Sequence, residues 1–217
     1  MQPNEIDKLT TRLLDWHDQL PWADDLGRIA APALTELAAG QPVDVELLAA
    51  RAGMTAASAS ALLCDSPAEF DDDGRLIGLG LTLRPTPHQV ELQGRILFTW
   101  CAGDTLMLPG LLGIPARVQS PCFATGEVVK VDVDPDGVRT VDPKSAVVSM
   151  VTPDVGLAEF RRHLCDQQHF FASPEAAAAW RTERPQAILV PVRDAFEVSG
   201  ALAQRWFAPS AAQERGA

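Results

Sequence analysis

The chain has 217 residues, 47% of them hydrophobic and 22% charged, so it can bury a sizeable core, which argues against a disordered or fibrous protein. Its net charge of −11 is uneven, because residues 1–73 hold four basic and fourteen acidic residues, a net of −10 that leaves −1 for the remainder. An N-terminal third this acidic opposes binding to a polyanion such as DNA.

The start of the sequence fits neither a secretory leader nor a membrane span. Acidic residues interrupt MQPNEIDKLTTRLLDW, and it contains no long apolar run. We therefore expect a cytoplasmic protein that does not associate with a membrane. In that reducing compartment the cysteines are expected to be free thiols and not disulfides; they are Cys64, Cys101, Cys122 and Cys165.

Residues 1–70 are predicted to form a helical N-terminal module. Apolar residues recur there at helical spacing, which indicates amphipathic helices at 4–20 and 24–39. Asp24 and Asp25 are the expected caps of the second helix, since short acidic side chains accept hydrogen bonds from the first N–H groups.

A helix-turn-helix is predicted at residues 43–65, with Thr55 as the N-cap of its second helix. Followed by a β-wing, this unit is typical of a winged-helix, metal-responsive transcriptional regulator, which is the main alternative function. Two features oppose it: the acidity of the module, and a second helix, TAASASALL, that offers no Arg, Lys, Asn or Gln to a base edge. We therefore favour a packing role for the module and expect no nucleic-acid partner.

The character of the sequence changes to strand-like runs after the turn at 71–74, which places a domain boundary near residue 70. A catalytic domain is expected over 71–207, followed by a flexible tail at 208–217. Because strands follow one another through short turns while helices come in separate blocks, the fold class is predicted to be α+β with antiparallel sheets and flanking helices. Predicted strands are 75–84, 90–100 (turning at Gln93–Gly94), 116–121, 126–134, 137–141, 146–151 and 187–192; predicted helices are 101–112, 154–164, 174–183 and 194–206.

Cys101 lies in FTWCAGDTLMLPG, where a strand gives way to a helix. At that position backbone N–H groups and the helix dipole favour a thiolate. Asp104, three residues on, shares the same helical face and lies between apolar flanks. A carboxyl group in such surroundings has a raised pKa, which suits it to carry a proton at neutral pH. The structural alternative for Asp104 is a helix cap.

Cys165 lies in RRHLCDQQHFFAS, and the basic neighbours that would favour its thiolate are Arg161, Arg162, His163 and His169. A dyad of His169 with Cys165 or Cys101 would instead indicate a cysteine hydrolase, although no local signature of such a family is present. The sequence also lacks the CxxC and HExxH patterns of zinc sites. Cys64 and Cys122 are interpreted as ordinary packing residues.

Four blocks of the sequence, FTWCAGDTLMLP, SPCFATG, LCDQQHFFAS and IGLGLTLRPT, closely resemble the bacterial organomercurial (alkylmercury) lyases, over roughly residues 25–205. The resemblance implies that Cys101, Asp104 and Cys165 are the catalytic set and that Cys122 is structural. It also implies a helical N-terminal part followed by antiparallel sheets. Asp166 stands where some members carry a second cysteine, so no mercury relay through adjacent thiols is expected there.

The resemblance further implies protonolysis of a carbon–mercury bond to a hydrocarbon and mercuric ion. Thiolates are soft donors suited to this metal, so Cys101 and Cys165, together with Asp104, would hold mercury as substrate and product. Asp104 would take a thiol proton and deliver it to carbon. Between reference pKa values this transfer is uphill by about 6 kcal/mol, and burial of Asp104 is expected to close much of the gap.

No organic cofactor is implied by the resemblance. The expected partners are the organomercurial substrate, cytosolic thiols that help to release mercuric ion, and a mercuric reductase that receives it.

Overall fold

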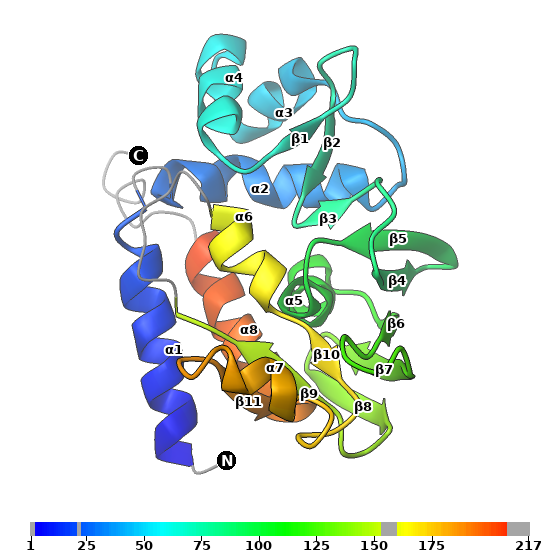
Figure 1. The fold of residues 1–217 in the computed structure, drawn as a ribbon. Helices are drawn as coiled ribbons and strands as arrows, with labels where there is room; N and C mark the ends of the chain where they lie inside the picture. The colour runs from blue at the N-terminus through cyan, green and yellow to red at the C-terminus, as the bar shows by residue number, and fades with distance from the viewer. Residues whose placement is uncertain (1–2, 21–22, 153–159, 208–217) are drawn as a thin grey trace.

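The computed structural model describes residues 3–20, 23–152 and 160–207. Four helices form the N-terminal third, as predicted, and Figure 1 shows α3 and α4 at one end of the molecule above α2. Their bounds are α1 (Pro3–His17), α2 (Ala23–Leu37), α3 (Val45–Ala52) and α4 (Ala56–Asp65).

The predicted helix-turn-helix is confirmed in α3 and α4. The chain leaves α3 through Gly53, whose φ of 63° is in the left-handed region that favours glycine, and Thr55 caps α4 by accepting a hydrogen bond from the N–H of Ser58 at 3.1 Å. The predicted caps of α2 are wrong. That helix begins at Ala23, so Asp24 and Asp25 lie inside it and not at the N-cap position.

An eight-stranded antiparallel sheet follows, in the order β1-β2-β3-β5-β4-β6-β7-β8. The turn at Gln93–Gly94 is confirmed, with φ of 50° and 79°. The predicted strand at 75–84 is broken at Gly80, whose φ of 80° turns the chain between two shorter strands. The bounds are β1 (Glu69–Phe70), β2 (Leu76–Leu79), β3 (Leu81–Thr82), β4 (His88–Leu92), β5 (Arg95–Thr99), β6 (Ala116–Pro121), β7 (Val128–Asp134) and β8 (Gly137–Asp142).

A second, three-stranded antiparallel sheet has the order β10-β9-β11. The helix predicted at 174–183 is shorter than expected, because the chain makes turns at 174–177 before α7 begins. Of the helix predicted at 154–164, residues 154–159 lie outside the described residues, as does the predicted tail at 208–217. The remaining elements are α5 (Ala102–Leu112), β9 (Val147–Met150), α6 (Phe160–His163), the 3-10 helix η2 (Cys165–Gln167), β10 (Phe170–Phe171), α7 (Ala178–Thr182), β11 (Ile188–Pro191) and α8 (Val192–Phe207).

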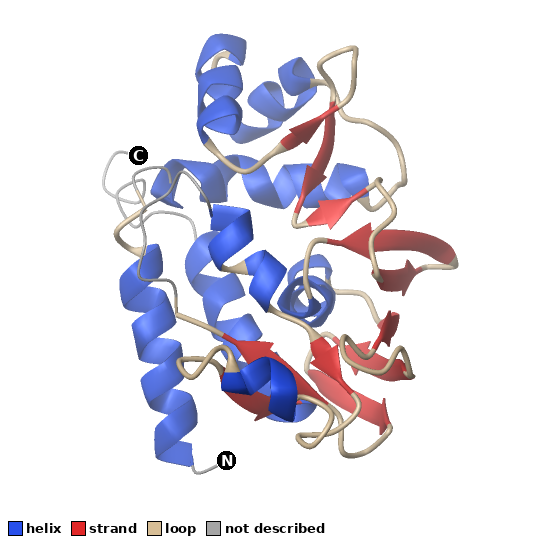
Figure 2. Cartoon of the chain, viewed as in Figure 1, coloured by secondary structure: helices blue, strands red, loops and turns tan. Residues whose placement is uncertain are grey.

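Helix α5 occupies the centre of the molecule. In Figure 1 it is seen almost end-on, between α8 and the strands of the large sheet, and the helix and strand colours of Figure 2 show the same arrangement. All residues from Ala102 to Pro109 are buried. A helix that is apolar on every side is stable only when it is covered on every side. The two antiparallel sheets and their flanking helices confirm the predicted α+β class. Helix α5 is the buried element that carries the candidate site.

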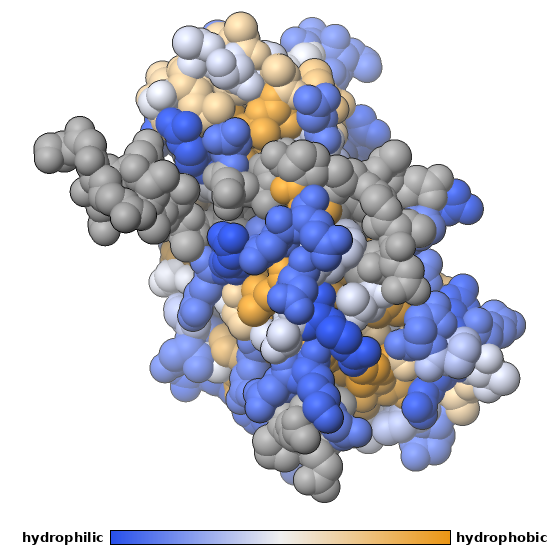
Figure 3. Space-filling model, turned by 90° about the vertical axis from the view of Figure 1, so that its left-hand side faces the viewer, coloured by the Kyte–Doolittle hydropathy of each residue, from blue (hydrophilic) through white to orange (hydrophobic). Residues whose placement is uncertain are grey.

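One hydrophobic core cluster includes residues of the N-terminal helices, the large sheet and α8. A β-bridge between Val43 and Leu76 joins the two sides of the boundary predicted near residue 70, and the division into domains at that point stays a prediction. Figure 3 shows one face of the molecule, on which hydrophilic residues predominate and apolar residues form separate patches. In the described part of the chain, no single helix has both the length and the apolar composition to cross a bilayer, and only the bent pair α3–α4, at 106°, passes on those two criteria.

Candidate functional site

Cys101 is the N-cap of α5. Its backbone is extended, with φ −147° and ψ 172°, and its sulfur accepts a hydrogen bond from the N–H of Asp104 at 3.4 Å. The loop that holds it is anchored on both sides: Thr99 donates its hydroxyl to the Cys101 carbonyl at 2.9 Å, and the N–H of Trp100 donates to the Gly80 carbonyl at 2.9 Å. The alternative interpretation of Asp104 as the helix cap is therefore wrong, because Cys101 is the N-cap residue.

Gln168 joins the start of α5 to the segment that carries Cys165. Its backbone carbonyl accepts from the N–H of Ala102 at 3.1 Å, and its side-chain oxygen accepts from the Cys101 thiol at 3.5 Å. Gly103 makes this approach possible, since a Cβ there would lie 2.1 Å from Gln168 Oε1. Sequence reasoning did not select Gln168, because nothing local indicates a contact between residues 67 positions apart.

The three residues predicted as the site converge. The sulfurs of Cys101 and Cys165 and a carboxyl oxygen of Asp104 all lie within 4.8 Å of one another. All three residues are buried, with exposed fractions of 2%, 3% and 5%. Oδ2 of Asp104 has no hydrogen-bond partner among the described residues, and Oδ1 lies 3.7 Å from the position of a Cβ at Gly80. Two thiols beside one carboxyl group form a donor set that can hold a soft metal.

Burial controls the proton affinity of Asp104. It raises the pKa of that carboxyl group to about 6, although hydrogen bonding with Cys101 and the charge of Arg161 act in the opposite direction. The raised pKa predicted from the apolar flanks is confirmed. Near neutral pH, Asp104 can therefore exchange a proton with its surroundings more readily than an exposed aspartate can.

The predicted thiolate character of the two cysteines is wrong. Burial raises the pKa of Cys101 well above its ordinary value, and the neighbouring Cys165 and Asp104 add to the rise. Hydrogen bonding with Cys101 lowers the pKa of Cys165, but burial and the charge of Asp104 outweigh it, so that pKa is raised too. Burial thus raises the pKa of the thiols as well as that of Asp104. The difference between the thiol and carboxyl pKa values, which burial of Asp104 was expected to reduce, therefore remains.

His169 does not act on the thiols as the sequence suggested. Its ring stacks on Phe123, with 4.0 Å between centroids, and meets Trp180 edge-on at 5.9 Å. Burial and the charge of Arg184 lower its pKa to about 4, so the imidazole is neutral at neutral pH. Arg161, one of the basic neighbours predicted to act on Cys165, does so: its charge lowers the pKa of that thiol.

The other two cysteines lie outside this cluster. Cys64 is exposed on α4, contrary to the packing role expected of it. Cys122 is buried in a second core cluster with Phe171 and Trp180, as a packing residue would be. Burial raises the pKa of Cys122, but hydrogen bonds from the Thr125 side chain and from nearby backbone groups outweigh this effect and lower it.

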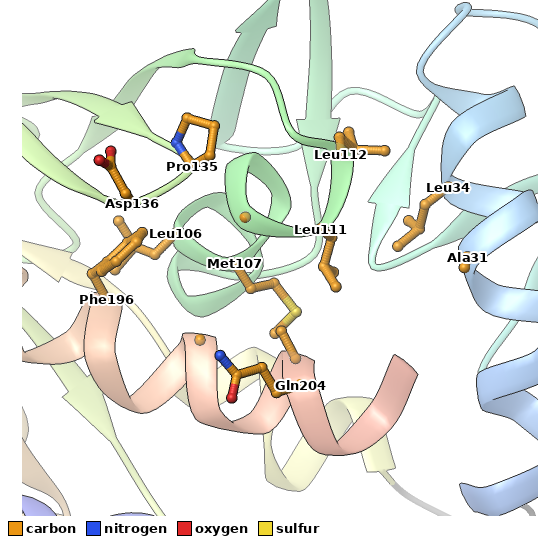
Figure 4. Close-up of a pocket in the computed structure, with 13 residues that line it drawn as sticks. Ala31, Leu34, Leu106, Met107, Leu111, Leu112, Pro135, Asp136, Phe196 and Gln204 are labelled. Carbon is orange, nitrogen blue, oxygen red and sulfur yellow. The ribbon is translucent and has the colours of Figure 1, made fainter. Parts of the chain in front are cut away.

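A cavity of about 770 Å³ lies between α2, α5, α8 and the turn from β7 to β8 (Figure 4). Leu106 and Met107 of α5 line it, together with Phe196 of α8, whereas the two thiols and Asp104 do not. The cavity therefore adjoins the helix that carries the site without containing the reactive groups.

Comparisons with known proteins agree with this chemistry. A sequence model of the family described as alkylmercury lyase matches residues 81–204, more than half of the chain. The alkylmercury lyase of Staphylococcus epidermidis is 46% identical over 176 residues, which cover 81% of either chain. That of Streptomyces lividans is 47% identical over 174 residues, or 80% of either chain.

A solved structure gives the same result for the fold. The crystal structure of the mercury-bound form of MerB2 superposes with a TM-score of 0.77 at 28% sequence identity, covering 90% of this chain and 99% of that one.

Proposed function

The chain belongs to the alkylmercury lyase family and is an enzyme of that kind, and on this premise we propose that Cys101, Cys165 and Asp104 carry out its reaction. The observation that carries the proposal is the convergence of two buried thiols and one buried carboxyl group within 4.8 Å. The substrate implied by the family is an organomercurial. Family membership also favours an enzyme over the winged-helix regulator considered from the helix-turn-helix.

The two thiols supply both the metal ligands and the protons. One sulfur bonds to mercury and displaces the ligand opposite the organic group, and its proton leaves with that ligand. The second sulfur then bonds to mercury, and Asp104 takes the proton that it releases. A second thiolate raises the electron density on mercury, so the carbon becomes a better proton acceptor. Asp104 delivers its proton to that carbon, and the products are a hydrocarbon and mercuric ion bound to two sulfurs.

The pKa values explain why metal binding must drive this proton transfer. Before mercury binds, the pKa of each thiol lies above that of Asp104, so the thiols keep their protons. Coordination reverses the order, because a thiol bound to a soft cation loses its proton outright. The raised pKa of Asp104, about 6, then makes it a competent acceptor and, once protonated, a competent donor.

The placement of Asp104 suits delivery to carbon. One of its oxygens lies within 4.8 Å of both sulfurs, so the carboxyl group is close to any metal that the sulfurs hold. Oδ2 has no partner among the described residues and can carry the proton without breaking a hydrogen bond. Burial keeps water from competing for that proton.

The remaining steps follow from the stability of the product. A dithiolate complex of mercuric ion is inert, so its release requires cytosolic thiols or transfer to a mercuric reductase. The proposed steps need free thiols, so the site of action in this proposal is the reducing cytoplasm. No organic cofactor takes part in the proposed steps.

Substitution of Asp104 by Asn tests the proposal, because an amide cannot act as the acid. Headspace gas chromatography measures the hydrocarbon released from an organomercurial, and mass spectrometry measures the mercury retained, for wild type and Asp104→Asn at one thiol concentration. We expect the variant to retain mercury and to release little or no hydrocarbon. Hydrocarbon release at the wild-type rate would show that another group supplies the proton.

A further inference from the structure

Glu69 belongs to the short strand β1, far in sequence from the proposed catalytic residues, yet its carboxylate reaches the segment that carries Cys165. Oε1 accepts a hydrogen bond from Arg161 at 2.5 Å, across 92 positions of sequence, and Oε2 accepts from the Thr82 hydroxyl at 2.6 Å. Only 15% of the Glu69 side chain is exposed. Charge-assisted hydrogen bonds at a half-buried site are stronger than those of an exposed ion pair.

The backbone leaves room for this carboxylate. Gly78 lies beside Glu69 in the antiparallel pairing of β1 with β2, and a Cβ at Gly78 would lie 2.3 Å from Glu69 Oε2. A side chain at that position would therefore displace the carboxylate from Thr82. Glu69 is held by two directed hydrogen bonds in a space that a larger residue would fill, which distinguishes it from a surface ion pair.

Arg161 transmits the position of Glu69 to the site. Its guanidinium carbon lies 4.5 Å from the centroid of the Trp100 ring, and Trp100 immediately precedes Cys101. Arg161 itself belongs to α6, which leads directly into η2 and Cys165. Arg161 therefore contacts Trp100, the residue before Cys101, and itself lies four positions before Cys165 in the sequence.

We propose that Glu69 is a positioning residue for the lyase reaction, which holds Arg161 against Trp100 and thereby keeps Cys165 at the distance from Cys101 that two-sulfur binding of mercury requires. The inference rests on the proposed roles of these two cysteines. It assigns the β1–β2 hairpin, at the edge of the N-terminal module, a direct part in the site. Without the carboxylate, one thiol still captures the organomercurial, but the second sulfur engages the metal slowly.

The test uses Glu69→Gln, which keeps an oxygen for Thr82 and removes the ion pair with Arg161. Intact-protein mass spectrometry distinguishes protein carrying the organomercury group from protein carrying mercury alone, and headspace gas chromatography measures hydrocarbon release. We expect the organomercury adduct to accumulate in the variant and kcat to fall by about 10-fold or more, with KM little changed, because misplacing a reacting group slows the chemical step. A purely structural role would lower the melting temperature without producing the trapped adduct.

Four further variants make the result decisive. Glu91→Gln is the matched control, since it removes an exposed ion pair with Arg117, 3.6 Å long, between β4 and β6. Arg161→Met combined with Glu69→Gln should lose no more activity than Arg161→Met alone, if Glu69 acts through Arg161. Thr82→Val, which leaves the charge of Glu69 but removes one anchor, should change kcat in the same direction and serves if Glu69→Gln folds poorly.

Equal kcat for Glu69→Gln and Glu91→Gln, or losses that multiply in the double variant, would overturn the inference. An absence of hydrocarbon from the wild-type enzyme would instead overturn the proposed function, so the two failures are distinguishable.

Discussion

The N–H of Asp104 donates a hydrogen bond to the sulfur of Cys101 at 3.4 Å, so the thiol proposed to bind mercury is also the N-cap of the helix that carries the proposed proton donor. The first turn of α5 thus fixes the distance between metal ligand and acid with backbone geometry. When the sulfur becomes a thiolate, it keeps this donor and gains the favourable field of the helix N-terminus. Metal capture and positioning of the acid therefore depend on the same turn.

The contrast among the cysteines gives the first prediction. Cys101→Ser and Cys165→Ser should each abolish hydrocarbon release while leaving the circular dichroism spectrum unchanged, because a hydroxyl group is a hard, weak ligand for mercury. Cys64→Ser is the matched control, since that thiol is exposed on α4 and should retain wild-type turnover. Turnover near the wild-type level in either of the first two variants would exclude a two-thiol mechanism.

The second prediction concerns stability and pH. Folding raises the pKa of Asp104 from 3.8 to about 6, so ionisation of this carboxyl group opposes folding. The contribution of the protonated carboxyl group to stability is complete below the unfolded pKa of 3.8 and is lost as the pH rises through about 6. Asp104→Asn removes this cost. At about pH 7.5 the variant should therefore exceed wild type in free energy of unfolding, by an amount of order 3 kcal/mol, and the difference should shrink towards about pH 4.5.

Urea denaturation of both proteins at the two pH values, with a reductant present, measures this difference. A stability difference that is the same at both pH values would show that Asp104 does not titrate in this window.

The third prediction concerns the contact between Gly103 and Gln168. In Gly103→Ala the new Cβ would lie 2.1 Å from Gln168 Oε1, so the Gln168 side chain must move. Its hydrogen bond with the Cys101 thiol is then lost. We expect kcat to fall by about 100-fold, since small displacements at a reacting centre have effects of that size.

Gly200→Ala is the control for the third prediction. Nothing lies within 4 Å of a Cβ at Gly200 in α8, so this substitution should raise stability by roughly 0.5–1 kcal/mol and leave kcat unchanged. Steady-state kinetics and thermal melting of both variants decide between a local contact and a general effect of adding a methyl group. Wild-type kcat in Gly103→Ala would show that the Gln168 contact is dispensable.

The sequence alone determined the features that depend on neighbours along the chain. Helical spacing predicted α1 and α2, the cap at Thr55 predicted the start of α4, and Gln93–Gly94 predicted the hairpin of β4 and β5. The pairing of Cys101 with Asp104 is of the same kind, since residues three apart in one helix must be neighbours. Resemblance to the family then supplied Cys165, which no local pattern would have joined to them.

Only the tertiary structure decided the contacts and charge states that depend on distant segments. Gln168 reaches Cys101, and Glu69 reaches Arg161, across 67 and 92 positions of sequence, through the pairing of strands and the packing of α5. The thiolate character predicted for Cys101 from the helix N-terminus and for Cys165 from its basic neighbours was wrong for the same reason. A thiol pKa depends on everything that surrounds the sulfur, and complete burial of both thiols in the folded chain outweighs the charges nearby in sequence.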